Sequence, residues 1–177
     1  MRKPRQLIEG SWYHVTARAN RKELIFDSGR MMALFEEVVK RAKKKYRFRV
    51  ENFCVLGNHF HLVIKPGRGE SLSAIMRWIM SVFAMSYNRC HGLTGHVWGE
   101  RFFSRAIAGL RDFFSVFEYV DENPVKANQV QSRDAWRHGG LFHAVAGRRD
   151  LIDEPPEWIG IMFPSRGPLL LDGGCDE

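Results

Sequence analysis

Hydrophobic positions along the chain follow two patterns. In four short segments, aromatic and β-branched residues gather between turn-forming residues, which is typical of strands. In three longer segments, apolar residues recur every three or four positions, which is typical of amphipathic helices. The predicted strands cover residues 12–17, 48–56, 59–64 and 102–107, and the predicted helices cover residues 31–42, 72–87 and 113–120.

Turn and capping residues mark the ends of these elements. Gly57-Asn58 fits a two-residue turn that joins the second and third strands into a hairpin. Ser71 and Asp112 are good N-cap residues, and Pro124 is expected to end the last helix. The order strand, helix, strand, strand, helix, strand, helix predicts an α+β, ferredoxin-like fold, in which an antiparallel four-stranded sheet has its helices packed on one face.

The charges divide the chain into a basic domain and an acidic tail. Residues 150–177 contain seven acidic residues and one arginine, so residues 1–149 carry a net charge of +13 within a total of +7. We expect one domain over residues 1–149 and an acidic C-terminal tail over 150–177, partly disordered. The basic domain favours a polyanionic partner, most simply nucleic acid, although the charge also fits a merely solubilising role.

The cysteines and the hydropathy indicate a soluble cytoplasmic protein. The three cysteines are odd in number and lack the short spacing of a zinc knuckle or a redox motif. No apolar run approaches the length that a membrane span requires, so we expect no membrane partner.

Two histidines in the third predicted strand are candidate metal ligands. Successive side chains of a strand point to opposite faces, so His59 and His61 share one face while Phe60 points into the core. Two imidazoles held side by side can bind one metal ion, but two half-buried structural histidines fit the same pattern. His14, in the first strand, is a weaker ligand candidate.

The last predicted helix carries a tyrosine outside its apolar stripe. Tyr119 lies on the same helix face as Asn123, one turn further on, so a phenol and a carboxamide oxygen can point into the same space. Without other motifs, an aromatic residue packed at a helix end is a simpler interpretation of Tyr119 than a functional one. Asp121 and Glu122 are able to support a metal, but an exposed acidic helix end explains them more simply.

Several basic residues lie beside the strand ends. They are available to contact phosphates, and an ordinary solvated loop explains them equally well. They are Arg18, Arg21 and Lys22 after the first strand, and Arg101 and Arg105 around the fourth.

Taken together, these segments resemble the HUH single-strand DNA tyrosine transposases (transposase IS200-like), most closely the REP-associated tyrosine transposases. The resemblance spans roughly residues 10–145, and its ordered series of motifs is far more specific than one His-x-His. The motifs are Tyr13-His14-Val15, Arg18-Ala19-Asn20, Ile25-Phe26, Asn58-His59-Phe60-His61-Leu62, Tyr87-Asn88-Arg89, Gly95-His96-Val97-Trp98, Arg101-Phe102, Ser104 and Tyr119-Val120-Asp121-Glu122-Asn123-Pro124-Val125-Lys126-Ala127.

The resemblance implies a DNA transposase or endonuclease that cleaves and rejoins single-stranded DNA with hairpin or palindromic structure. Tyr119 matches the nucleophile that forms a 5′-phosphotyrosine, His59 and His61 match the metal-binding motif, and Asn123 is the third-ligand candidate. Imidazole ligands alone favour zinc, copper or nickel, whereas phosphoryl transfer and the family point to Mg²⁺ or Mn²⁺, which we expect here. Because one phosphoester replaces another, no nucleotide cofactor is required.

The chain departs from the family pattern at three places. Ala19 replaces a usual glycine, Gly57 stands where proline is common, and Asp121-Glu122 replaces a less acidic pair. These changes bear on DNA affinity and sequence preference, because no proposed ligand or nucleophile is lost.

Two other functions fit the same residues. The first is a rolling-circle replication initiator or relaxase-like nickase that uses the same site on an origin. The second is a catalytically silent DNA-binding regulator that acts through its basic face alone. The sequence is compatible with a monomer and with a homodimer that exchanges the tyrosine helix.

Overall fold

Four antiparallel strands form one sheet in the order β2–β3–β1–β4. The computed structural model describes residues 8–154 and 157–163. Its strands are β1 (Tyr13–Arg18), β2 (Phe48–Leu56), β3 (His59–Pro66) and β4 (Phe103–Ala106), and each forms where the sequence predicts a strand. The two central strands, β1 and β3, are far apart in the chain but pair along their whole shared length.

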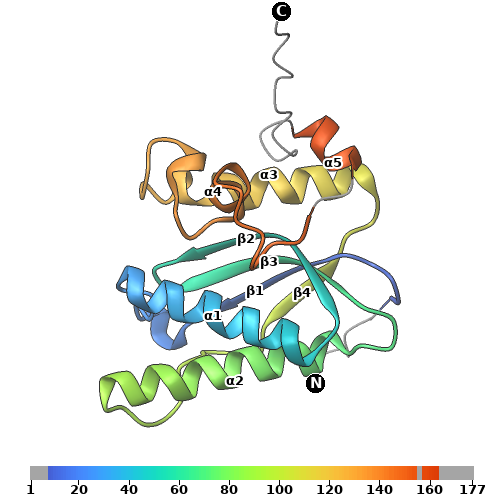
Figure 1. The fold of residues 1–177 in the computed structure, drawn as a ribbon. Coiled ribbons are helices and arrows are strands. Elements are labelled where there is room, and N and C mark those ends of the chain that lie inside the picture. The colour runs from blue at the N-terminus through green and yellow to red at the C-terminus, as the bar shows by residue number, and fades with distance from the viewer. Residues whose placement is uncertain (1–7, 155–156, 164–177) are drawn as a thin grey trace, which may run out of the picture.

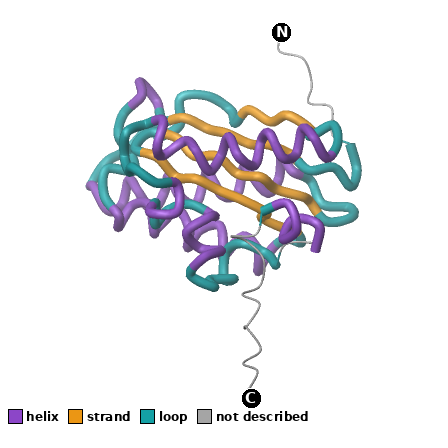
Figure 2. The backbone as a smooth tube through the Cα atoms, turned by 90° about the horizontal axis from the view of Figure 1, so that it is seen from above, coloured by secondary structure: helices purple, strands orange, loops and turns teal. Residues whose placement is uncertain are grey.

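Helices cover both faces of this sheet (Figure 1). On one face lie α1 (Gly29–Lys45) and α2 (Leu72–His91), and on the other lie α3 (Leu110–Lys126), α4 (Gly140–Val145) and α5 (Glu157–Met162). In a view at right angles, the strands form one layer with helices running across it (Figure 2). Two 3-10 turns, η1 (Asn20–Lys22) and η2 (Arg133–Ala135), lie in the connections.

The α+β class and the antiparallel four-stranded sheet are therefore confirmed, and the expected one-sided packing holds for α1 and α2. The third helix lies on the opposite face because the central strands are apolar on both sides. Phe60 and Leu62 of β3 join the core under α1 and α2, whereas Val63 joins a second core with Phe113 and Phe117 of α3. This second core holds α3 over the face that carries His59 and His61.

Of the two expected helix caps, Ser71 is confirmed and Asp112 is not. The hydroxyls of Ser28 and Ser71 accept hydrogen bonds from backbone amides three residues further on, at the starts of α1 and α2. Asp112 is not an N-cap, because α3 begins two residues earlier. Its carboxylate instead accepts from the backbone N–H of Ala108, just before the helix, and from Arg105.

Pro124 does not end α3, as the sequence suggested. The helix continues through it to Lys126, and the Pro124 ring is buried. A proline removes a single backbone donor, and this one stands within the last turn, where little helix follows it. Asn123 is therefore helical, one turn after Tyr119.

Packing continues past residue 149, where the domain was expected to end. Leu151 and Ile152 are fully buried in the main core, and Asp153 pairs with Lys43 of α1 at 2.7 Å. The segment is held by these contacts despite its acidic composition. The predicted disorder of residues 164–177 falls outside the described residues. In the part of the chain that the structure describes, no helix has the length and apolarity needed to cross a membrane.

Candidate active site

A cavity of about 580 Å³ opens between the α3 face of the sheet and the segment that enters β4. It brings together the predicted nucleophile Tyr119, both predicted ligand histidines and two of the predicted phosphate-binding arginines. The full lining comprises His14, Thr16, Ala17, Arg18, Ala19, His59, His61, Gly99, Glu100, Arg101, Phe103 and Tyr119.

Strand register explains why these side chains meet. Thr16 pairs with His61 and Arg18 pairs with His59 across β1 and β3. Paired residues of antiparallel strands point to the same face. The shared face of His59 and His61, predicted from their spacing, is thus the face on which β1 presents Arg18 and His14.

Both candidate ligand histidines have their Nδ1 atom engaged. Nδ1 of His59 lies 2.8 Å from Oδ1 of Asn58, and Nδ1 of His61 lies 3.0 Å from Nε2 of His14. The His14 and His61 rings stack, with centroids 5.2 Å apart. Since the partner of one ring nitrogen fixes the ring's orientation, both side chains are held so that Nε2 remains for a ligand.

Nε2 of His61 is buried and has no hydrogen-bond partner among the described residues. A buried polar atom without a partner is costly and calls for an explanation, such as an unseen ion or water. A metal ion would provide one, because neutral imidazole nitrogen is a common metal ligand.

The electrostatics keep these imidazoles neutral. Burial, together with the charge of Arg18, lowers the pKa of His59 to about 4. Burial lowers the pKa of His61 to about 3, with further contributions from His14, His59 and Arg18. The pKa of His14 falls to about 4, mainly through burial and also through Arg105. At neutral pH the ring lone pairs are therefore available to a cation.

Tyr119 lies against the same histidines. Its ring centroid is 5.6 Å from that of His61 and 5.9 Å from that of His14, and both contacts are edge-to-face. The side chain is 44% exposed, so the ring meets the cavity without being buried by it. Within one chain, α3 therefore places the Tyr119 ring against the histidines of the sheet.

Asn123 is less directly placed. Its amide nitrogen donates to the backbone carbonyl of Tyr119 at 2.6 Å, and the described residues that line the cavity do not include it. The neighbouring acids face elsewhere. Asp121 is buried and accepts a hydrogen bond from Asn52 of β2, and half-buried Glu122 pairs with Lys126. The interpretation of Asp121 as part of an exposed acidic helix end is therefore wrong.

The predicted phosphate-binding residues fall into three groups. Arg18 and Arg101 are exposed and line the cavity. Arg21 and Lys22 are exposed in η1, where both have positive φ, and stand outside the described lining. Arg105 forms a two-point ion pair with Asp112, at 2.7 and 2.9 Å, which joins β4 to the first turn of α3.

Sequence reasoning undervalued two residues of this cavity, His14 and Phe103. The alternation of β1 places His14 on the Thr16 face, but only its pairing across strands reveals the contact with His61. Phe103 was predicted only to be part of a strand. It is 60% exposed and lines the cavity because β4 is an edge strand of the sheet.

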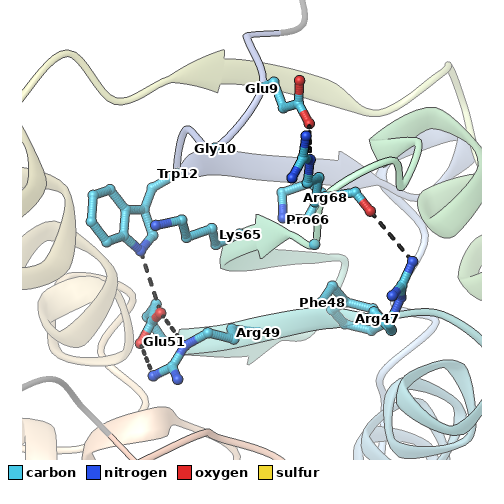
Figure 3. Close-up of a pocket in the computed structure, with 11 residues that line it drawn as sticks. Glu9, Gly10, Trp12, Arg47, Phe48, Arg49, Glu51, Lys65, Pro66 and Arg68 are labelled. Atoms are coloured by element: carbon cyan, nitrogen blue, oxygen red, sulfur yellow. Dashed lines mark hydrogen bonds and ion pairs between the residues drawn. The ribbon is translucent and has the colours of Figure 1, made fainter.

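A larger cavity, of about 870 Å³, lies away from the histidines (Figure 3). Four of its charged side chains form two ion pairs: Arg49 lies 2.9 Å from Glu51, and Arg68 lies 4.0 Å from Glu9. The indole of Trp12 also donates to Glu51. This cavity lacks a candidate nucleophile, so the smaller one is the better active-site candidate.

The donor set at the smaller cavity fits a divalent cation, although it is sparse. Among the described histidine, cysteine, aspartate and glutamate residues, no group of three has the arrangement of a complete metal site. Of the predicted ligands, only the two imidazoles of His59 and His61 line this cavity, so the remaining positions around a cation would be left to phosphate oxygens and water.

Comparison with known proteins gives a family match, a relative and a similar solved structure. Residues 8–123 match the family model described as "Transposase IS200 like". A Haemophilus influenzae protein named as a REP-associated tyrosine transposase is 24% identical over 138 residues, covering 71% of this chain and 75% of that protein. The solved structure of a REP-associated tyrosine transposase bound to a REP hairpin has the same fold. Its TM-score is 0.69 at 24% identity, over 85% of this chain and 88% of that one.

Proposed function

The chain belongs to the family of IS200-like transposases. From this premise we propose that it cleaves and rejoins hairpin-forming single-stranded DNA through a 5′-phosphotyrosine on Tyr119. The observation that carries the proposal is the contact of the Tyr119 ring with the His61 ring, in a cavity that also holds Arg18 and Arg101. The REP hairpin bound by the structurally similar protein supports a hairpin substrate.

The chemistry follows from what these side chains do. The Tyr119 oxygen attacks the phosphorus, a tyrosyl phosphoester forms, and the bond from phosphorus to the 3′ oxygen breaks. The phenol loses a proton and the departing 3′ oxygen takes one up, leaving a free 3′-hydroxyl. Arg18 and Arg101 hold the phosphates of the strand. The step reverses when a 3′-hydroxyl of a new strand attacks the tyrosyl phosphoester.

His59 and His61, through Nε2, and Asn123, through its side-chain oxygen, are the residues that would hold the metal. Mg²⁺ or Mn²⁺ there would polarise the scissile phosphate and stabilise the charge that develops on its oxygens. The neutral state of both histidines and the unpartnered Nε2 of His61 support this assignment.

Labelled hairpin oligonucleotides test the proposal. Incubation with Mn²⁺ or Mg²⁺ is expected to give a denaturant-resistant adduct that carries a 3′ label but not a 5′ label, because Tyr119 retains the 5′-phosphate. Tyr119→Phe is expected to bind DNA but to form no adduct, and Tyr87→Phe, on α2, serves as the matched control. His59→Ala is expected to lose the metal-dependent cleavage.

Three outcomes separate the alternatives. An adduct that persists in Tyr119→Phe would show that the nucleophile is another residue. Binding without cleavage of any hairpin would favour the silent regulator. Cleavage confined to a replication or transfer origin would favour the initiator or relaxase-like nickase.

A further inference from the structure

Phe103 is a large apolar side chain that the structure leaves in solvent at the active-site cavity. It is 60% exposed, although it stands in β4 and follows buried Phe102. Burying a phenylalanine side chain is worth about 1.5–3 kcal/mol, so a ring left exposed at a concave site has a surface available to a ligand.

The sheet register fixes where this ring stands. Thr16 of β1 pairs with His61 on one side and with Phe103 on the other. The three side chains therefore share a face. Neighbouring strands lie about 4.8 Å apart, which puts the backbone of Phe103 roughly 10 Å from that of His61. The ring lines the same cavity as the histidines and Tyr119.

Two arginines line the same cavity as the ring. Arg101 precedes Phe103 by two residues, and Arg18 stands at the end of neighbouring β1, and both line the cavity. An exposed aromatic ring in a cavity that also holds cations is the combination that binds single-stranded nucleic acid, because a base stacks on the ring and the phosphates of the strand meet the charges.

We propose that Phe103 is a stacking platform for an unpaired nucleobase next to the scissile phosphate. This inference rests on the proposed function, and it names a base-binding subsite in the same cavity. Stacking accepts every base, so the subsite places the strand without reading its sequence. The phosphodiester that faces Tyr119 is thereby selected by its distance from the stacked base.

The chain's other exposed apolar side chains provide a matched comparison. Met85 is 62% exposed, but it stands on α2, on the opposite side of the sheet. Truncating Met85 removes a similar exposed apolar surface without touching the cavity. An effect specific to Phe103 is then separated from a general effect of surface hydrophobicity.

A double-mutant cycle between protein and DNA tests the proposal without requiring cleavage. Fluorescence anisotropy measures the affinity of full-length protein for a single-stranded hairpin substrate and for a series in which each nucleotide beside the hairpin is made abasic in turn. Phe103→Ala is expected to weaken binding of the intact strand roughly 5- to 150-fold, as the loss of one stacked base does. Phe103→Trp and Met85→Ala are expected to retain it.

The cycle identifies the stacked position. At one position the abasic change is expected to weaken binding by wild type and to have little further effect on Phe103→Ala. The proposal would be overturned if each abasic change weakened DNA binding equally in wild type and in Phe103→Ala. An unchanged affinity of Phe103→Ala for the intact strand would also overturn it. The Tyr119-dependent adduct, measured in parallel, shows whether the proposed function stands when the stacking proposal fails.

Discussion

The Asn52 side-chain amide donates a hydrogen bond to the Asp121 carboxylate at 2.9 Å and a second to the carbonyl of Phe117 at 3.2 Å. Asn52 belongs to β2 and is fully buried. Its two partners stand two residues before and two residues after Tyr119 on α3. The edge strand β2 thus holds α3 at positions on both sides of Tyr119. We infer that these two hydrogen bonds fix the position of Tyr119 relative to the histidines.

Asn52→Ala is expected to lower the free energy of unfolding by about 1–3 kcal/mol, because buried partners on α3 lose a hydrogen bond. Adduct formation is expected to slow more than DNA affinity falls, since the tyrosine moves while the arginines stay in place. Urea unfolding and single-turnover adduct assays measure the two effects. Asn88→Ala, which removes an exposed hydrogen bond to Gly95, is the control. Equal losses in rate and affinity would contradict a positioning role.

His14→Ala is expected to weaken metal binding about 10- to 100-fold, as is usual when the partner that orients a ligand histidine is lost. The reason is that Nε2 of His14 holds Nδ1 of His61. Calorimetric Mn²⁺ titration measures the effect directly, and the Mn²⁺ concentration for half-maximal adduct gives a second reading. His14→Gln, which can restore the hydrogen bond, is expected to recover part of the loss. An unchanged Mn²⁺ affinity in His14→Ala would refute this role.

The Arg105–Asp112 pair is expected to make a pH-dependent contribution to stability. Hydrogen bonds from Arg105 and from the Ala108 backbone lower the pKa of Asp112 below its ordinary value of 3.8. A carboxyl group whose pKa is lower in the folded state stabilises the fold above the unfolded value, and the stabilisation is lost as pH falls through the folded value. Asp112→Asn is therefore expected to be about 0.5–1 kcal/mol less stable at pH 7. Urea unfolding should show the difference shrinking below pH 3.8, and a constant difference would contradict the assignment.

Arg18→Ala and Arg101→Ala are each expected to weaken binding of single-stranded DNA by similar factors for all sequences. Each lost phosphate contact is expected to reduce the slope of log affinity against log salt by about 0.7. Titrations at several NaCl concentrations measure this slope. Glu37→Ala, on the far side of the molecule, removes a charge from α1 as a control. A slope that stays at the wild-type value in both arginine variants would place the DNA elsewhere.

A mixture of Tyr119→Phe and His59→Ala is expected to form no adduct. Tyr119 meets His61 within one chain, so neither variant supplies what the other lacks. Co-refolding of the two variants, followed by the adduct assay with Mn²⁺, tests this directly. An adduct from the mixture would mean that two subunits exchange their tyrosine helices.

The sequence by itself determined the local features of this protein. The order of strands and helices and the shared face of His59 and His61 follow from periods of two and of about 3.6 residues along one segment. The cap at Ser71 follows from a serine placed just before a helical pattern. The ordered motifs also identified the family, which the family model confirms.

Only the tertiary structure decided which side chains meet across segments. His14 contacts His61 because β1 pairs with β3 in one register, and Arg105 is held by Asp112 because β4 ends beside the start of α3. The burial of Asp121 and the exposure of Phe103 likewise depend on which elements lie beside them in the fold. Side-chain direction is a property of a single strand or helix, but the neighbour it meets depends on register and on the sheet face that each helix covers, which contacts distant in the chain determine.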